Sequence, residues 1–287
     1  MNLLFIITSD YIEKLKTLLF SIKLNNIKEH IKTFLIVEEE NTFKKTDNLK
    51  EFCKLLNIEI SFIRVPEKIF FNAPVSKRYP RMVYYRLIAQ DFLPKNLKRI
   101  LYLDCDILCI NSLKNFYNLN FENNYYIAAD HHINKNLKIS AAFNNIRLGN
   151  YGGKNYFNSG VLLMNLVKLR KQGNLKKISD FINKNNFQLF FPDQDILNGL
   201  YGNRIKPTKD IYYNYETKFF SIYKFFSSGT IDLNWVINNT VFLHFCGKEK
   251  PWFKLYKGKF SALYKHYQHL VKRIDQIVKR INQINTK

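Results

Sequence analysis

The chain has 287 residues, 46% of them apolar, which is enough for one large domain with a substantial core or for a domain with an appendage. Its 45 basic and 23 acidic residues give a formal charge of +22, so an anionic partner is expected: nucleic acid, an acidic membrane or a phosphorylated substrate. The spacing of its four cysteines fits neither a zinc site nor a disulfide framework, which favours a reducing, cytoplasmic location. The first seven residues lack the features of a signal peptide, and no apolar run is long enough to span a membrane.

The first quarter of the chain alternates predicted strands and helices. Ser9 and Asp10 are expected to cap the first helix, whose apolar positions repeat at helical spacing. The order strand, helix, strand, helix, strand predicts a doubly wound α/β sheet. No Gly-x-Gly-x-x-Gly follows the first strand, so a dinucleotide fold of the common type is not expected. The strands are predicted over residues 3–8, 34–37 and 58–65. The first helix is predicted to carry Leu15, Leu18, Leu19 and Ile22 on one face, and the second is predicted over residues 46–56.

Predicted elements continue to residue 245. Loops are expected over 67–80 and 131–154, the second covering the site. Strands are expected from residue 99, over 125–129, within 155–166 and over 240–245, and helices over 81–92, 166–186 and 192–200.

Two carboxylates, Asp104 and Asp106, follow the apolar run that begins at Arg99. Charges in such a run are costly to bury unless something pairs with them. Residues two apart point to one side of an extended chain, so both carboxylates can meet one cation at the carboxyl end of a strand. A hard divalent cation that also contacts phosphate oxygens would explain the pair, and a strand running into a polar turn is the alternative.

Other polar residues also stand at the ends of predicted strands, so they are expected to line one cleft. His244 lies in an apolar strand, where a buried core histidine is the simpler interpretation, but two carboxylates and one imidazole also make a suitable Mn²⁺ site. Gly247 allows a backbone to approach a ligand closely, and Lys250 could neutralise a phosphate. The remaining members of the expected cleft are Asp130, Asn158, Asp193, Gln194 and Asp195.

Five motifs follow one another along the chain: Tyr85-Arg86-Leu87, Leu101 to Asp106, Phe157-Asn158-Ser159-Gly160, Asp193 to Asn198, and His244 to Trp252. In this order they resemble glycosyltransferase family 8, in particular the bacterial lipopolysaccharide galactosyl- and glucosyltransferases. The resemblance runs from Leu3 to about Trp252. It implies a nucleotide-diphospho-sugar transferase (GT-A) fold, a UDP-hexose donor, Mn²⁺ with Mg²⁺ as the alternative ion, and transfer with retention of anomeric configuration.

The resemblance also implies roles for single residues. Asp104, Asp106 and His244 would bind Mn²⁺, and Gly247 and Lys250 would contact the diphosphate. Thr8 stands where close relatives carry an aspartate that faces the uracil, and Cys105 and Ser159 replace an isoleucine and an alanine in the donor site. Uridine would lie near Thr8, Asp10 and Tyr11, and the donor sugar near Arg86, Asp130, Asn158, Asp193 and Gln194. Gln194 would face the anomeric carbon, with Asp193 and Asp130 beside the reacting sugar. For Asp193 and Asp195, capping of a helix is the other expected role.

Residues 253–287 are predicted to form a separate tail after a catalytic domain of residues 1–252. Eight apolar residues repeat every three or four positions, which predicts a long amphipathic helix. The segment from Pro251 carries nine basic residues and one acid, Asp275. An interfacial helix on anionic lipid is the first interpretation, and packing on the main domain and a coiled coil are the alternatives. The stripe consists of Phe260, Leu263, Tyr267, Leu270, Ile274, Ile277, Ile281 and Ile284.

The resemblance implies a hexosyltransferase that extends a surface glycan or glycolipid, and the cysteines and the basic tail place it in the cytoplasm, peripheral on the inner face of the membrane. Two alternatives stay open. A nucleic-acid-binding protein would account for the charge, but no binding motif is found and the basic residues are spread along the chain. A non-catalytic sugar-nucleotide-binding protein is the other, although Asp104, Asp106 and His244 together argue against it. The choice of galactose or glucose, the acceptor and the oligomeric state do not follow from the sequence.

Overall fold

The computed structural model describes residues 1–37, 46–66, 68–76, 79–130, 148–149, 155–185 and 189–285, with side chains in the last helix described as far as residue 277. The predicted loop over residues 131–154 lies almost wholly outside these residues. Within the described part of the chain, no helix has both the length and the apolar character needed to cross a membrane.

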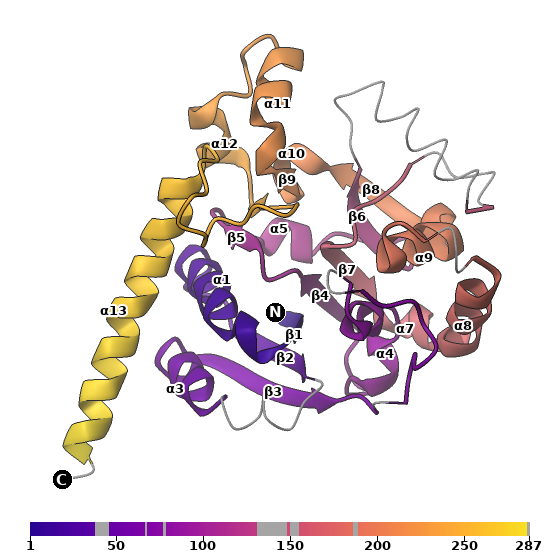
Figure 1. The fold of residues 1–287 in the computed structure, drawn as a ribbon, viewed down its shortest axis with the longest axis horizontal. Helices are drawn as coiled ribbons and strands as arrows, with labels where there is room; N and C mark the ends of the chain where they lie inside the picture. The colour runs from indigo at the N-terminus through magenta and orange to yellow at the C-terminus, as the bar shows by residue number, and fades with distance from the viewer. Residues whose placement is uncertain are drawn as a thin grey trace.

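A seven-stranded mixed sheet forms the centre of the molecule (Figure 1). Its order is β3-β2-β1-β4-β7-β6-β8, and β7 runs antiparallel to both of its neighbours while every other neighbouring pair is parallel. The predicted wound α/β sheet is therefore confirmed. The strands are β1 (Asn2–Ile7), β2 (Ile31–Val37), β3 (Ile58–Arg64), β4 (Arg99–Leu103), β6 (Tyr126–Asp130), β7 (Val161–Asn165) and β8 (Ile205–Lys209).

Helices cover both faces of this sheet because its central strands are apolar on both sides. Leu3 and Phe5 of β1 face a core shared with α1 (Ile12–Asn25) and α3 (Asp47–Leu55). Leu4 faces the opposite core. That second core is shared with the 3₁₀ helix η2 (Arg81–Leu87) and with α4 (Ala89–Phe92), α7 (Leu166–Leu169), α8 (Asn174–Asn185) and α9 (Pro192–Tyr201).

A second sheet of three strands joins the large one through a short turn. It has the order β5-β10-β9, from β5 (Ile107–Cys109), β9 (Tyr215–Glu216) and β10 (Phe242–His244). β10 is antiparallel to β5 and parallel to β9. Residues 104–106 carry the chain from β4 in the large sheet to β5 in the small one. Smaller helices surround the second sheet: α5 (Lys114–Tyr117), α10 (Asp210–Tyr213), α11 (Phe220–Phe226) and α12 (Leu233–Asn239).

Several predicted helices differ from the observed ones. Ser9 and Asp10 do not cap α1; they form the 3₁₀ turn η1 (Ser9–Tyr11), and no side chain caps α1. The helix expected over 81–92 is mostly 3₁₀, in η2. The long basic helix expected over 166–186 is interrupted at Gly173, whose φ of 59° lies in the left-handed region and ends the 3₁₀ turn η3 (Arg170–Gln172).

The tail forms one helix, α13 (Ser261–Asn285), and its first half packs on the main domain beside α1 and α3 (Figure 1). Tyr264 and Val271 are buried, and Tyr267 meets Phe20 of α1 edge to face, with 6.2 Å between the ring centroids. The packing alternative is thus confirmed for this half. The apolar side of the helix is already covered by protein there, so it is not available to enter a bilayer.

The single acid of the tail also holds it to the domain. Lys16 of α1 is buried, and its Nζ lies 3.0 Å from Oδ1 of Asp275. The same ammonium donates to Oδ1 of Asn48 at 2.7 Å and pairs with Glu13. A buried ammonium needs such partners, since an unpaired one would be costly to desolvate.

Candidate functional site

The turn with Asp104 and Asp106 is held by backbone hydrogen bonds on both sides. The N–H of Asp104 donates to the carbonyl of Gly160 at 2.8 Å, and the N–H of Phe245 donates to the carbonyl of Asp106 at 2.9 Å. The two carboxylates were expected to share one side of an extended strand, and that is wrong. They converge because residues 104–106 bend between the two sheets.

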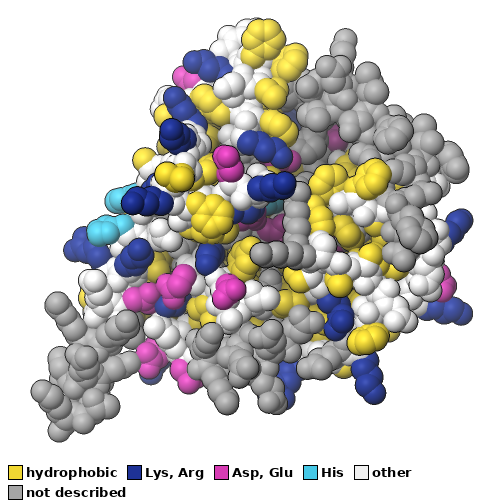
Figure 2. Space-filling view, viewed as in Figure 1, with side chains coloured by type: hydrophobic (Ala, Val, Ile, Leu, Met, Phe, Trp, Pro, Cys, Tyr) yellow, Lys and Arg dark blue, Asp and Glu magenta, His cyan; other side chains and the backbone are white. Residues whose placement is uncertain are grey.

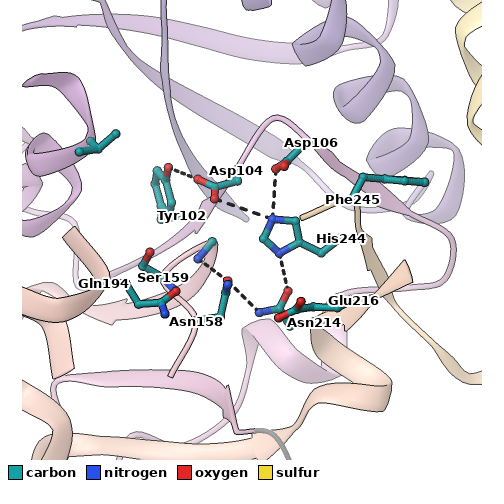
Figure 3. Close-up of polar contacts among 12 residues, drawn as sticks. Tyr102, Asp104, Asp106, Asn158, Ser159, Gln194, Asn214, Glu216, His244 and Phe245 are labelled. Carbon is teal, nitrogen blue, oxygen red and sulfur yellow. Dashed lines mark hydrogen bonds and ion pairs between the residues drawn. The ribbon is translucent and has the colours of Figure 1, made fainter. Parts of the chain in front are cut away.

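His244 completes a cluster of three possible metal ligands (Figure 3). Antiparallel pairing of β10 with β5 sets His244 opposite Ile107, next to Asp106. Its Nε2 lies 3.1 Å from Oδ1 of Asp106 and 3.8 Å from Oδ2 of Asp104. One ligand atom from each residue lies within 4.8 Å of the others, and within the described part of the chain this is the one such group. Two carboxylate oxygens and one imidazole nitrogen suit a divalent ion such as Mn²⁺.

Lys250 adds positive charge to this cluster. Its Nζ pairs with Asp106 and donates to the carbonyl of Phe245 at 2.9 Å. Burial raises the pKa of Asp106, but His244 and Lys250 outweigh it, so that pKa lies well below its usual range. Burial lowers the pKa of Lys250, and the Asp106 carboxylate more than restores it. Gly247 has a φ of 111°, a conformation that L side chains rarely adopt, which explains the glycine in this loop.

Arg86 connects the carboxylate cluster to the start of α9. Its Nη1 lies 3.0 Å from Oδ1 of Asp104 and 3.2 Å from Oδ2 of Asp193. Burial lowers the pKa of this guanidinium, but the carboxylates of Asp104 and Asp193 hold the pKa above its usual value. Ser159 donates its hydroxyl to Asp193 at 2.7 Å, and burial raises the pKa of Asp193. Residues from four separate motifs therefore form one largely buried network.

Two neighbouring amides lie at the same edge of the sheet. β7 runs antiparallel to β4, so the residues before β7 meet the residues after β4. Oδ1 of Asn158 accepts from the N–H of Gly160 at 2.9 Å, and Oε1 of Gln194 accepts from the N–H of Ser159 at 3.3 Å. Asp195, in contrast, accepts from the N–H of Phe191 at 3.0 Å, as a capping residue does, and binds the Tyr156 hydroxyl.

The remaining predicted residues follow β1 and β6. Thr8, Asp10 and Tyr11 stand directly after β1. The Tyr11 ring meets Trp252 at 6.1 Å. Burial raises the pKa of Tyr11, and Lys250 and Asp106 are near enough to influence it. Asp130 is the last residue of β6 and is buried. Cys105 is buried inside the turn, so burial raises the pKa of its thiol well above the usual value.

Sequence reasoning missed two residues of this site. Tyr102 donates its hydroxyl to Asp104 and stacks under the Arg86 guanidinium, 4.5 Å from ring centroid to Cζ. Asn214 contacts His244, with 2.7 Å between Oδ1 and Nδ1. Tyr102 could have been suspected, since it lies two residues before Asp104 in a strand, where side chains share one side. Asn214 carries no signal, because it stands alone among tyrosines between α10 and β9, far from every motif.

Gly160 leaves no room for a side chain beside the cluster. A Cβ at this position would overlap Cε1 of His244 and lie 2.7 Å from Oδ2 of Asp104. Gly160→Ala should therefore push the two ligands apart and weaken Mn²⁺ binding by at least about tenfold, as disturbed ligand positioning does. Titration with Mn²⁺, followed by electron paramagnetic resonance of the free ion, measures this.

Gly173→Ala is the matched control for that substitution. It introduces strain at a left-handed φ of 59° but meets nothing within 4 Å. It should lower thermal stability without changing Mn²⁺ affinity. Equal Mn²⁺ affinity in Gly160→Ala and the unmodified protein would contradict the crowding argument.

Comparison with known proteins places this site in a family. The model of glycosyl transferase family 8 matches residues 2–255. A putative glycosyltransferase of Haemophilus influenzae is 28% identical over 254 residues, covering 88% of this chain and 73% of that protein. A lipopolysaccharide 1,2-glucosyltransferase of Escherichia coli is 28% identical over 234 residues, covering 80% of this chain and 66% of that protein.

Solved structures show the same fold. The galactosyltransferase LgtC, crystallised with donor and acceptor sugar analogues, superposes with a TM-score of 0.76 at 23% identity, over 94% of this chain and 95% of that one. The described sheet is thus that of a nucleotide-diphospho-sugar transferase of the GT-A type. Because the family model spans every predicted site residue and all ten strands found among the described residues, the chain belongs to glycosyl transferase family 8.

Proposed function

We propose that the protein is a retaining hexosyltransferase that moves galactose or glucose from a UDP-sugar to a surface glycan such as lipopolysaccharide. The contacts of Arg86 with both Asp104 and Asp193 carry this proposal, because they join the candidate metal cluster to a buried carboxylate at the start of α9. The relatives named as lipopolysaccharide glucosyltransferases and a galactosyltransferase support the choice of hexose and acceptor.

The proposed metal site consists of Asp104, Asp106 and His244. Mn²⁺, or Mg²⁺ as the alternative, would stabilise negative charge on the leaving diphosphate. When the donor binds, the ammonium of Lys250 would move from Asp106 to the diphosphate, because the metal ion would then neutralise Asp106. Gly247 would let the backbone of its loop approach the phosphates closely.

The donor would lie along the edge of the sheet where these motifs meet. Uridine is proposed to contact the residues after β1, namely Thr8, Asp10 and Tyr11. The sugar is proposed to lie against the Arg86 network, the two neighbouring amides and the end of β6. The residues concerned are Arg86, Asp130, Asn158, Ser159, Asp193 and Gln194, together with Cys105 in the turn of residues 104–106. Asp193 and Asp130 would orient sugar hydroxyls, since a carboxylate accepts hydrogen bonds from them.

Retention is proposed to occur by attack on the face that the leaving group occupies. The acceptor oxygen bonds to the anomeric carbon as the carbon–oxygen bond to the phosphate breaks, and the phosphate oxygen takes the acceptor's proton. Gln194 would lie near the anomeric carbon without bonding to it, because an amide is a poor nucleophile. Its Oε1 contact with the N–H of Ser159 supports a positioning role.

Gln194→Ala should accordingly keep measurable transfer, with a loss of about 10- to 100-fold from poorer positioning of the donor. A covalent mechanism through Gln194 would leave no transfer above background. Single-turnover assays with labelled UDP-sugar and mass spectrometry of the intact protein decide the question. A glycosyl adduct on Gln194 would contradict same-face attack, though not the assignment to the family.

Hydrolysis of UDP-galactose and UDP-glucose, measured with Mn²⁺ and with EDTA, tests the proposed function. A hexosyltransferase should release UDP slowly with Mn²⁺ and stop with EDTA, and mass spectrometry should identify the preferred donor. A non-catalytic sugar-nucleotide-binding protein would bind UDP without turnover. Binding of RNA or DNA without UDP affinity would favour the nucleic-acid alternative.

The protein is also proposed to work on the cytoplasmic side of the inner membrane, held there by the outer side of α13. Basic side chains gather along α13 in the space-filling view (Figure 2). Lys265, Lys272 and Arg273 are exposed, as is Ile277 further along. Since the inner side packs on the domain, attraction of these charges to anionic lipid would provide most of the affinity.

Lys265→Glu/Lys272→Glu should weaken binding to anionic vesicles by at least about tenfold, because each basic residue near the surface contributes about 1 kcal/mol. High salt should weaken binding of the unmodified protein in the same direction. Vesicle co-sedimentation measures both effects. The control Lys176→Glu/Lys184→Glu changes two exposed lysines of α8, across the molecule (Figure 1), and should bind normally.

Equal binding by the two double variants would contradict the role of α13. Truncation after Trp252, at the proposed boundary between the catalytic domain and the tail, is a poorer test. Phe260 and Tyr264 are buried in the core around the small sheet, so the truncation would remove part of that core.

A further inference from the structure

Asn214 lies beside His244 because of how the small sheet is paired. It follows α10 and directly precedes β9, whose Glu216 pairs with His244 in the parallel register. Its backbone N–H donates to the carbonyl of Asp210 at 2.9 Å, which fixes the end of α10. The residue is 1% exposed, so its amide makes its hydrogen bonds within the protein.

The orientation of the Asn214 amide follows from a backbone donor two residues away in the network (Figure 3). The N–H of Gly160 can only donate, so the Asn158 atom that receives it at 2.9 Å is the amide oxygen. That oxygen lies 3.1 Å from the nearer terminal atom of Asn214, which must therefore be its NH₂ group. The other terminal atom of Asn214, 2.7 Å from Nδ1 of His244, is consequently its oxygen.

An amide oxygen accepts hydrogen bonds and cannot donate them. Nδ1 of His244 must therefore carry a proton, and in the neutral ring the lone pair is then on Nε2. Nε2 is the nitrogen that faces Asp106 at 3.1 Å and Asp104 at 3.8 Å. A metal-binding histidine needs the lone pair on this nitrogen, and the partner of its other nitrogen sets which tautomer is present.

We propose that Asn214 is a positioning residue that holds His244 in the tautomer and orientation required for metal binding, with Asn158 and Gly160 fixing the Asn214 amide in turn. This inference rests on the proposed metal site. Without the acceptor at Nδ1, the neutral ring can place its proton on Nε2 and donate it to Asp106, which withdraws one of the three ligands.

Three variants and one spectroscopic measurement test this role. Asn214→Leu removes the acceptor and should weaken Mn²⁺ binding by about 10- to 100-fold, the usual cost of losing such a partner. Asn214→Asp keeps an acceptor for Nδ1 but loses the donor to Asn158, so it should keep most of the affinity. Asn26→Leu is the matched control: this asparagine is also buried, stands at the C-cap of α1, and accepts from the N–H of Leu113 at 3.1 Å. It should leave Mn²⁺ affinity unchanged.

The spectroscopic measurement observes the unmodified protein, and His244→Gln serves only to assign its signals. Burial lowers the pKa of His244, but Cys246 and Asp106 raise it well above its usual value, so the spectra are recorded at a pH high enough for the ring to be neutral. Long-range ¹H–¹⁵N correlation spectra of metal-free protein with labelled histidine should then show neutral His244 protonated at Nδ1. Protonation at Nε2, or equal Mn²⁺ affinity in Asn214→Leu and the unmodified protein, would overturn the inference while leaving the metal site standing. Absence of Mn²⁺ binding by the unmodified protein, with or without UDP, would overturn the metal site and this inference together.

Discussion

Replacing Asp106 by asparagine should reduce hexosyl transfer by about three orders of magnitude and leave the fold intact. A bound divalent ion provides several kcal/mol of charge stabilisation in the transition state, and each 1.36 kcal/mol is a factor of ten in rate. The substitution keeps the shape of the side chain but removes the charge that faces both His244 and Lys250. The backbone of residue 106, which accepts from Phe245, is unchanged.

The measurement combines turnover of UDP-sugar, Mn²⁺ titration and circular dichroism. Asp106→Asn should lose both turnover and Mn²⁺ affinity at normal secondary structure. Asp180→Asn on the exposed side of α8 is the control for loss of one carboxylate, and it should retain both. Full activity of Asp106→Asn, or activity of the unmodified protein that EDTA does not change, would refute the metal site.

The wound sheet could be predicted because its strands are short apolar runs separated by helices of clear periodicity. Leu15, Leu18, Leu19 and Ile22 are all buried in α1, as their spacing predicts. Helix ends were harder to predict, since they depend on single residues. The break at Gly173 requires knowing that this glycine takes a left-handed conformation. The 3₁₀ helix η2 packs against α9, which lies about 100 residues later in the chain.

The metal cluster could be predicted in composition but not in geometry. Its residues are conspicuous because charges in apolar strands need partners. Their convergence depends on a turn between two sheets, and the second sheet was not foreseen. The strand predicted over 240–245 contains β10, but β5 and β9 have only three and two residues, too few for a periodic signal. The contacts of Asn214 follow from this sheet, so they were out of reach for the same reason.

The second large effect is expected on protein stability when Arg86 is replaced. Arg86→Met should destabilise the protein by about 3–5 kcal/mol, because it leaves the carboxylates of Asp104 and Asp193 without their buried counter-charge. Urea unfolding followed by fluorescence measures this. Hexosyl transfer should fall as well, since Asp104 is a proposed metal ligand and Asp193 is proposed to contact the sugar.

A double variant separates the lost ion pair from lost packing. Arg86→Met/Asp193→Asn no longer has the second unpaired carboxylate, so it should recover part of the stability that Arg86→Met loses. Arg170→Met is a control for loss of a bridging guanidinium, because Arg170 donates to backbone carbonyls, including those of Leu97 and Pro94. It should lower stability without changing Mn²⁺ affinity. Two results would contradict this argument: Arg86→Met could be as stable as the unmodified protein, or adding Asp193→Asn could lower the stability of Arg86→Met further. In either case the Arg86 network would not be one of the interactions that stabilise the fold.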